Sequence, residues 1–346
     1  MVLVDLRFWA RNAVGSFADC AILLPLIAAL GFQGGYSTSV LFFTAGLAYL
    51  VSGFLFRIPM SIQPLKSIVI AGLAMGASCM EIRVSAALLG CICLALVFFK
   101  VNRIAENIPK SLIHGIQVGL GILLVIQGWK YGVTWIDSRC IYAVSPAGSG
   151  ALVKSTSTLS SNLCRFPLLV SLVLPQLALT LANSVLGTQS AAKKYFGERA
   201  FRVTVNRLLL SIGLGNIVSA LIGGLPYCHG SGGLTAHYRG GSTHLISNVI
   251  IGMSLVVLGI VAWWKGSLLV ALPYPLMAGL LIITGLFHIY LAQETWKKPF
   301  GKFKLLTLGG LTLISQNLLW VLAFGLGLEA AFRLFEELAA RDQISL

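Results

Sequence analysis

The chain consists largely of long apolar runs, and most of its lysines and arginines lie in the short stretches between them. Hydrophobic residues make up 57% of the 346 residues and charged residues only 10%, a composition outside the usual range of a soluble globular domain. About 20 apolar residues are enough for a helix to cross the hydrocarbon core of a bilayer. We therefore expect an all-α multi-pass membrane protein that forms a single transmembrane domain over residues 1–346.

The expected membrane segments fall into two halves with the same order of elements. In the first half we expect long helices over residues 13–30, 38–56, 84–99 and 112–129, with a shorter segment over residues 67–79. In the second half we expect them over residues 167–186, 208–223, 245–263 and 268–290, with a shorter segment over residues 230–238. Residues 305–338 are long enough for two short helices or one tilted helix. An odd number of spans before the second half would invert it in the membrane, as in many secondary transporters.

The basic residues show a strong bias to one side of the predicted membrane. If the chain starts on the inner side, eighteen of the 25 lysines and arginines lie inside, six lie outside, and Lys66 lies in the membrane. The net charge of +14 therefore indicates contact with membrane lipids and not with nucleic acid. The membrane can be the plasma membrane or an internal, vacuolar-type one, and a homodimer is an open alternative to a monomer.

Two short segments are broken by proline or glycine at matching places in the two halves. Residues 59–67 read PMSIQPLKS, and the two prolines prevent one continuous helix while leaving Pro64 free to occupy the first turn of a new one. Residues 226–233 read PYCHGSGG, in which the glycines allow close approach to a ligand and Ser231 is a candidate N-cap. Each segment is therefore expected to start a half-helix at membrane depth.

Two helix N-termini aimed at one point form an anion site, because each carries a partial positive charge. Lys66 and His229 are expected to reinforce this charge. The alternative is that the glycines and prolines serve only kinking or close packing of membrane helices. The candidate substrate-binding residues are Gln63, Lys66, Ser67, His229, Gly230, Ser231, Gly232 and Gly233.

Other polar residues are expected to have a coupling or core role. Asp19, Gln176 and Asn183 lie within predicted spans, and Asp19 can either carry a coupling proton or pair with Lys66. Neither metal-binding nor catalytic spacings occur in the sequence, so we expect no metal site, no cofactor and no enzyme activity. Cys140 and Cys164 bracket a stretch rich in serine and threonine, and they can form a disulfide if that stretch faces an oxidising compartment.

The two broken segments, extended to Leu234 and followed by AHYR at residues 236–239, resemble the two signature motifs of the molybdate transporter family, which is related to the sulfate permeases. Supporting stretches lie at residues 17–19, 23–26, 115–119, 175–180 and 183–185. The resemblance implies a secondary active transporter that carries molybdate by alternating access, with proton coupling through Asp19 or a neighbour. Sulfate has the same shape and charge as molybdate, so a carrier of sulfate or another oxyanion stays open.

The resemblance also implies a fold of two inverted repeats of about seven segments each, with a core domain and a gate domain. The oxyanion would lie between the third and tenth segments, the two broken half-helices, which would meet at the midplane. Two further gate helices are expected after residue 129, but residues 131–166 read as a polar loop with PAGSG at 146–150. The first repeat would span residues 1–130 and the second residues 167–346, with the gate helices of the first repeat incomplete. An anion channel or a transport-defective paralogue is therefore a further alternative.

Overall fold

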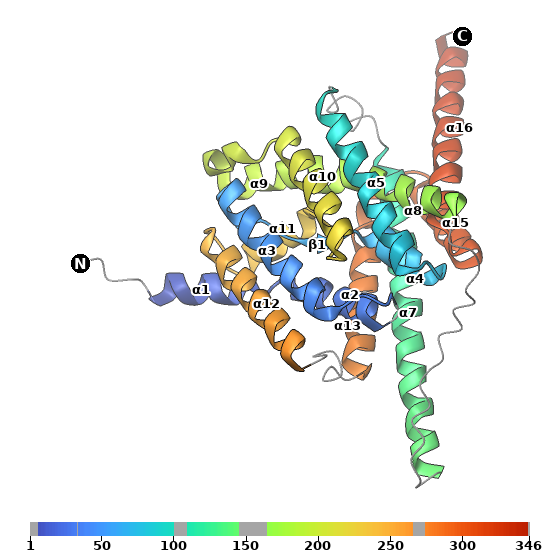
Figure 1. Cartoon of the computed structure of the whole chain (residues 1–346). Coiled ribbons are helices and arrows are strands. Elements are labelled where there is room, and N and C mark those ends of the chain that lie inside the picture. The colour runs from blue at the N-terminus through green and yellow to red at the C-terminus, as the bar shows by residue number, and fades with distance from the viewer. Residues whose placement is uncertain (1–5, 33, 100–108, 145–164, 266–273, 345–346) are drawn as a thin grey trace.

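The computed structural model describes residues 6–32, 34–99, 109–144, 165–265 and 274–344. Nearly all of these residues are helical, and most of the helices pack side by side in one bundle, from which parts of α1, α7 and α16 project (Figure 1). Within the described ranges, seven helices are long and apolar enough to cross a membrane by length and composition. The all-α, multi-span architecture predicted from the apolar runs is therefore present.

The first half begins with two helices instead of one. α1 (Leu6–Ser16) and α2 (Cys20–Phe32) are separated by a turn that contains Asp19, where the sequence predicted a continuous helix. α3 (Thr38–Phe56), the two-residue strand β1 (Gln63–Pro64), the π-helical turn η1 (Ser67–Ala71) and α4 (Gly72–Ala74) follow. The described part of this half ends with α5 (Cys79–Val97) and α7 (Lys110–Val144).

The second half begins with one long helical rod, formed by α8 (Phe166–Leu179), the π-helical segment η2 (Thr180–Gly187) and α9 (Thr188–Phe196). The next elements are the 3-10 helix η3 (Gly197–Arg202), α10 (Val205–Ile222), the strand β2 (Tyr227–Cys228), α11 (Ser231–Arg239) and α12 (Ile246–Lys265). The last elements are α13 (Tyr274–Tyr290), α14 (Gln293–Trp296), α15 (Gly301–Ser315) and α16 (Leu318–Ile344). The final apolar stretch thus forms two helices and not one tilted helix.

The end of α7 corrects the sequence-based boundary at residue 129. The helix continues to Val144, so residues 131–144 are helical and not part of a polar loop. The physical reason is that these residues contain no proline, and the first helix-breaking proline after Pro109 is Pro146. Residues 145–164 lie outside the described part of the chain, and so does the predicted disulfide, because the side chain of Cys140 and the whole of Cys164 are not described.

Helices from the two halves pack against each other at pairs of glycines. α3 crosses α12 at Gly46 and Gly252, and α5 crosses α10 at Gly90 and Gly213. At each crossing, a Cβ atom built on one glycine would lie 2.6–3.0 Å from the carbonyl oxygen of the other. The backbones are therefore in direct contact there, as is common between membrane helices with small residues at the interface.

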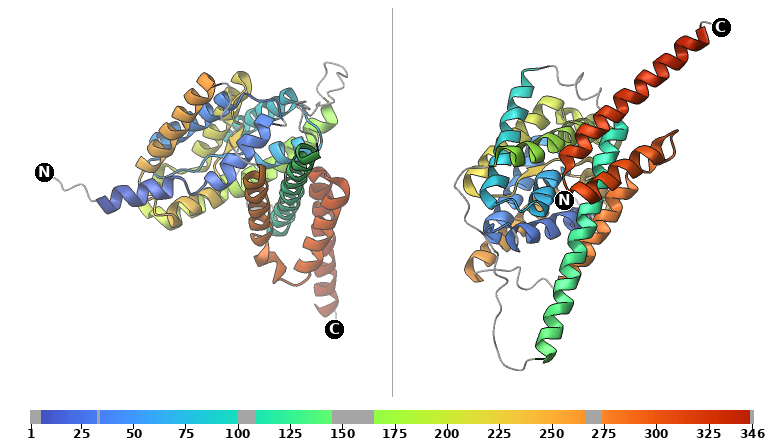
Figure 2. Two further views of the ribbon diagram at one scale, coloured as in Figure 1. Left: turned by 90° about the horizontal axis from the view of Figure 1, so that it is seen from below. Right: turned by 90° about the vertical axis from the view of Figure 1, so that its right-hand side faces the viewer.

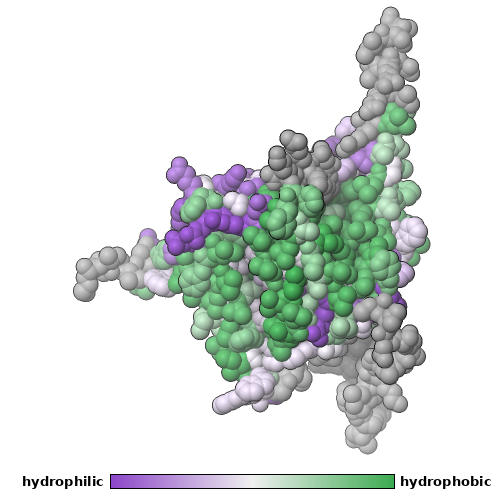
Figure 3. Space-filling model, turned by 45° about the horizontal axis from the view of Figure 1, so that its top comes forward, coloured by the Kyte–Doolittle hydropathy of each residue, from purple (hydrophilic) through white to green (hydrophobic). Residues whose placement is uncertain are grey.

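α7, α13, α15 and α16 form a group on one side of the molecule (Figure 2). We call this group the gate-side helices. The outer surface of the bundle carries a broad apolar area, with hydrophilic side chains gathered toward one end (Figure 3). Large apolar residues such as Phe54 in α3, Leu221 in α10 and Trp263 in α12 are exposed. Such a surface suits contact with lipid hydrocarbon.

Candidate functional site

The two broken segments pair with each other directly. β1 and β2 run antiparallel, with Gln63 opposite Cys228 and Pro64 opposite Tyr227. The Leu65 N–H donates to the Pro226 carbonyl at 2.9 Å, and the Ser61 hydroxyl donates to the Gly230 carbonyl at 2.7 Å. Pro64 therefore lies in a short strand before the first half-helix, and the prediction that it occupies the first helical turn was wrong.

Two buried asparagines hold the irregular backbone of these segments. Asn248 in α12 accepts a hydrogen bond from the Met60 N–H at 2.9 Å and donates one to the Met60 carbonyl at 2.8 Å. Asn216 in α10 does the same for Tyr227, at 2.9 Å and 2.6 Å. Buried backbone groups outside regular structure need such partners. The two side chains thus supply the hydrogen bonds that a continuous helix would otherwise provide.

The helix that follows each broken segment begins beside the long helix formed by α8, η2 and α9. The Ser67 N–H, at the start of η1, donates to Gln176 Oε1 at 2.8 Å. α11 begins at Ser231 with Gly230 as its N-cap and no side-chain cap, and the Ser231 hydroxyl donates to Asn183 Oδ1 instead. The prediction of Ser231 as N-cap was therefore wrong by one residue. The first N–H groups of α11 have no partner within the helix.

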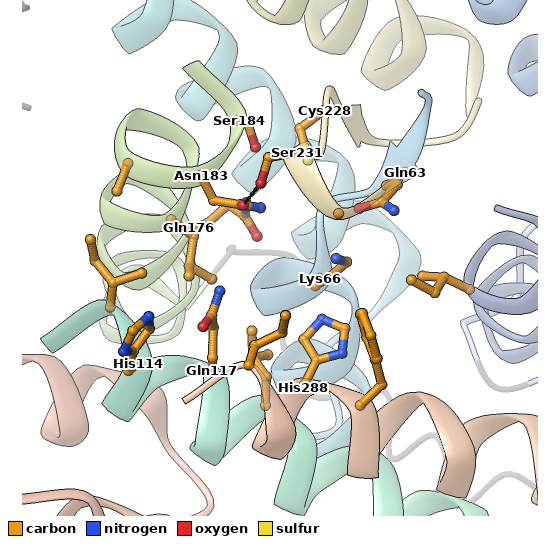
Figure 4. A pocket seen from close by; sticks show the side chains of 18 of the residues that line it. Gln63, Lys66, His114, Gln117, Gln176, Asn183, Ser184, Cys228, Ser231 and His288 are labelled. Atoms are coloured by element: carbon orange, nitrogen blue, oxygen red, sulfur yellow. Dashed lines mark hydrogen bonds between the residues drawn. The ribbon is translucent and has the colours of Figure 1, made fainter. Parts of the chain in front are cut away.

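A cavity of about 310 Å³ lies between the broken segments, the η2 region and the gate-side helices α7 and α13. Its volume is at the lower end of the range for small-molecule sites, roughly 300–1,000 Å³. Six of the residues predicted from the sequence line it, namely Gln63, Lys66, Gln176, Asn183, Ser231 and Gly232. Figure 4 shows Lys66 among these polar side chains. The Lys66 ammonium forms neither a hydrogen bond nor an ion pair with any described residue.

His229 does not line this cavity, although the sequence placed it in the anion site. Its side chain is fully buried, with Nδ1 donating to the Ser61 carbonyl at 3.0 Å and Nε2 lying 2.9 Å from the Ser211 hydroxyl. A carbonyl oxygen can only accept, so Nδ1 carries the hydrogen and Nε2 accepts from Ser211 in the neutral ring. His229, which belongs to the second broken segment, thus links that segment to the first one and to α10.

Ser67, Gly230 and Gly233 also lie outside the cavity lining. The two glycines pack against polar side chains: a Cβ atom on Gly230 would collide with Gln63, and one on Gly233 would collide with Asp19 and Gln63. Both glycines therefore allow close packing of the two broken segments and Asp19. By contrast, a Cβ atom on Gly232 would meet nothing within 4 Å.

Asp19 is buried in the turn between α1 and α2, behind Gln63. Its Oδ1 accepts a hydrogen bond from Gln63 Nε2 at 2.6 Å, while its Oδ2 has no partner among the described residues. The expected pair between Asp19 and Lys66 is not one of the ion pairs found in the described ranges. The hydrogen-bond partner of this carboxylate is the Gln63 amide, and Lys66 acts on it only through its charge.

Several residues that line the cavity were missed or left unassigned by the sequence analysis. They are Lys110, His114, Gln117, Ser184, Cys228, His288 and Glu294. Cys228 lies inside the second motif, and Gln117 and His288 are polar residues in apolar helices, which is a signal of function in membrane proteins. The sequence does not show which of these side chains point into the cavity.

Comparison with known proteins gives consistent matches to transporters. A family profile described as a molybdate transporter of the MFS superfamily matches residues 11–124 and 168–287. Molybdate transporter 1 of Chlamydomonas reinhardtii is 34% identical over 142 residues, which cover 39% of this chain and 27% of that protein. Molybdate transporter 2 of Arabidopsis thaliana is 19% identical over 398 residues, covering 90% of this chain and 84% of that protein.

Two solved structures share the fold at low sequence identity. The transmembrane domain of a cyanobacterium bicarbonate transporter, BicA, superposes with a TM-score of 0.62 at 16% identity, covering 90% of this chain and 97% of that one. The murine solute carrier 26 family member A9, an anion transporter in the inward-facing state, gives a TM-score of 0.61 at 11% identity, covering 97% of this chain and 69% of that one. Both similarities concern the fold.

Proposed function

Because this chain belongs to the molybdate transporter family, we propose that it is a secondary active transporter that carries molybdate across a membrane by alternating access. Membership rests on a profile match that covers both halves of the chain. As the sequence predicted, the protein is a multi-pass membrane protein of a transporter family and not an enzyme. The particular membrane and a homodimeric state remain predictions.

The observation that carries this proposal is the position of Lys66. Its ammonium group lies at a cavity between two broken segments and is not paired with a described carboxylate. Lys66 is half-buried, and a cation that has lost part of its contact with water is stabilised by a neighbouring anion. A tetrahedral dianion would supply that compensation, and Gln63, Gln176, Asn183 and the first turn of α11 would offer hydrogen-bond donors around it.

The packing supports two inverted repeats. The second long helix predicted in the first half (α3) packs on the third predicted in the second half (α12), and the third of the first half (α5) packs on the second of the second half (α10). The antiparallel pairing of β1 with β2 has the same reciprocity. An axis of twofold pseudosymmetry in the membrane plane would produce both features. We propose that the broken segments and their neighbours form the core domain, and that the gate-side helices form a gate that is incomplete in the first repeat.

Proton coupling through Asp19 is part of the proposal. The Asp19 carboxylate lies next to Gly233 in the first turn of α11, so its negative charge would oppose a dianion in the cavity. Protonation would remove this repulsion and favour binding. Molybdate and a proton would then enter together, and the unpartnered Oδ2 is an atom that can take the proton.

Uptake of molybdate tests the proposal. The full chain is expressed in cells that lack their own molybdate transporter, and cell-associated molybdenum is measured by mass spectrometry. We expect saturable uptake that persists in excess sulfate. Uptake that sulfate abolishes would identify a general oxyanion carrier, and flux that does not saturate would identify an anion channel. A folded protein without any flux would identify a transport-defective paralogue.

A further inference from the structure

The side of the cavity that faces the broken segments is formed by α7 and α13, and its polar side chains include Gln117 and His288 beside Lys110 and His114 (Figure 4). Lys66, Asn183 and Ser231 come from the opposite side. An ion in the cavity would therefore lie between two sets of polar groups on different groups of helices. The proposed function above uses only the polar groups on the side of the broken segments, and it gives no role to Gln117 and His288.

Gln117 is buried without a hydrogen-bond partner. The residue is 9% exposed, and its Oε1 has no partner among the described residues. Leaving a buried amide unpaired costs about 1–3 kcal/mol, so such groups usually meet a ligand or water. A bound oxyanion would accept from Nε2, for which no hydrogen bond to a described residue is found, whereas Oε1 only accepts and needs a donor such as water.

His288 is held in an orientation that leaves one ring nitrogen for the cavity. The residue is 2% exposed, and Nδ1 lies 2.9 Å from the Thr284 carbonyl one turn earlier in α13. The carbonyl can only accept, so Nδ1 carries a hydrogen. Nε2 has no partner within the described ranges, and the ring lines the cavity. With a second proton on Nε2, the imidazolium can donate a charge-assisted hydrogen bond to an oxyanion.

A glycine contact fixes these two side chains relative to each other. A Cβ atom on Gly121 in α7 would lie 2.5 Å from the Gly285 carbonyl oxygen, and one on Gly285 would lie 2.5 Å from the Gly121 carbonyl oxygen. Gln117 is four residues before Gly121 and His288 is three residues after Gly285. Residues at these spacings lie on the same face of a helix. The contact between Gly121 and Gly285 therefore keeps Gln117 and His288 at a fixed position relative to each other.

We propose that Gln117 and a protonated His288 form the second half of the oxyanion site, so that the substrate is bound from the core side and the gate side at once. This inference rests on the proposed function and names the gate-side contacts of the same site. The Lys66 ammonium repels an imidazolium at His288, so the second proton would be taken up together with the dianion, whose two negative charges then balance the two cations. The other ionisable groups facing this region are Asp19 beside α2, Cys228 in β2, Lys110 and His114 in α7, and Glu294 in α14.

Equilibrium binding of molybdate to the purified full-length protein in detergent tests the proposal, with bound molybdenum measured by mass spectrometry after dialysis. Gln117→Leu and His288→Leu should each weaken binding about 10-fold or more, because each removes a hydrogen bond to a charged ligand. His288→Gln should restore most of the affinity, because an amide nitrogen can take the place of Nε2. Wild-type affinity in both leucine variants would overturn the inference.

Protonation of His288 has its own test. In the Asp19→Asn background, binding should still weaken as pH rises, and adding His288→Gln should abolish that pH dependence. Persistence of the same pH profile in the double variant would overturn the assignment of a proton to His288.

The glycine crossing provides a matched pair of variants. Gly285→Ala should disturb the position of His288 and weaken binding, whereas Gly279→Ala in the same helix should not, because a Cβ atom at Gly279 would meet nothing within 4 Å. Equal effects of the two would contradict the coupling of Gln117 and His288 through the crossing.

The outcomes separate this inference from the proposed function. If Lys66→Ala abolishes binding while both leucine variants bind normally, the inference fails and the function stands. The protein can also bind sulfate but not molybdate. If the two leucine variants then lose sulfate binding, the inference stands and the proposed substrate is wrong. If the wild-type protein binds neither anion, both fail.

Discussion

Gln63 donates a hydrogen bond from Nε2 to Oδ1 of Asp19 at 2.6 Å, and this bond joins the first broken segment to the turn between α1 and α2. Gln63 lines the cavity and Asp19 lies behind it. A change in the protonation of Asp19 is thereby linked to a residue that faces the proposed substrate. This relationship is the structural basis for the proposed coupling.

The first prediction concerns the charge of Asp19. Asp19→Asn removes the negative charge and keeps an oxygen that can accept from Gln63, so the protein should still fold and bind molybdate. Uptake into proteoliposomes should lose most of its response to an imposed pH gradient. Asp19→Leu, which leaves the Gln63 amide unpaired, should impair folding as well. A wild-type response to the gradient in Asp19→Asn would show that the coupling proton binds elsewhere.

The second prediction compares two adjacent glycines in α11. Gly233→Ala places a methyl group against Asp19, Gln63 and Ser61, and should destabilise the protein by about 1–3 kcal/mol, the usual cost of overpacking. Gly232→Ala should leave stability nearly unchanged, since nothing lies within 4 Å of its Cβ position. Thermal unfolding in detergent measures both. Equal melting temperatures would argue against the close contact between α11 and Asp19.

The third prediction concerns the asparagines that hold the broken segments. Asn216→Leu removes both partners of the Tyr227 backbone and Asn248→Leu removes both partners of the Met60 backbone. Each unsatisfied buried group costs about 1–3 kcal/mol, so both variants should unfold at clearly lower temperature than the wild type. Asn206→Leu is the control, because Asn206 is exposed in α10. If all three variants unfold at the same temperature, the two asparagine side chains do not stabilise the broken segments.

Much of this architecture could be predicted from the sequence, because its causes are local. Apolar runs predicted the spans, and the prolines and glycines of the two motifs predicted where helices break. The position of Pro64 was predicted wrongly because its strand partner, Tyr227, is distant in the chain. Ser231 was predicted wrongly as the N-cap because its hydroxyl group donates to Asn183 instead.

The gate-side half of the site could not be predicted for a related reason. Gln117 and His288 are single polar residues in apolar helices, and only the crossing of α7 with α13 brings them together. His229 is the opposite example. Its motif predicted a position in the anion site, but its ring contacts Ser61 and Ser211 instead. Contacts between distant segments decided all of these positions.

The most direct test of the central claim is molybdate uptake by Lys66→Ala in cells without another molybdate transporter. Lys194→Ala is the matched control, because Lys194 is exposed at the end of α9, away from the cavity lining. At equal amounts of folded protein in the membrane, we predict that Lys66→Ala loses saturable uptake and Lys194→Ala retains it. Wild-type uptake by Lys66→Ala would contradict an oxyanion site built around this lysine.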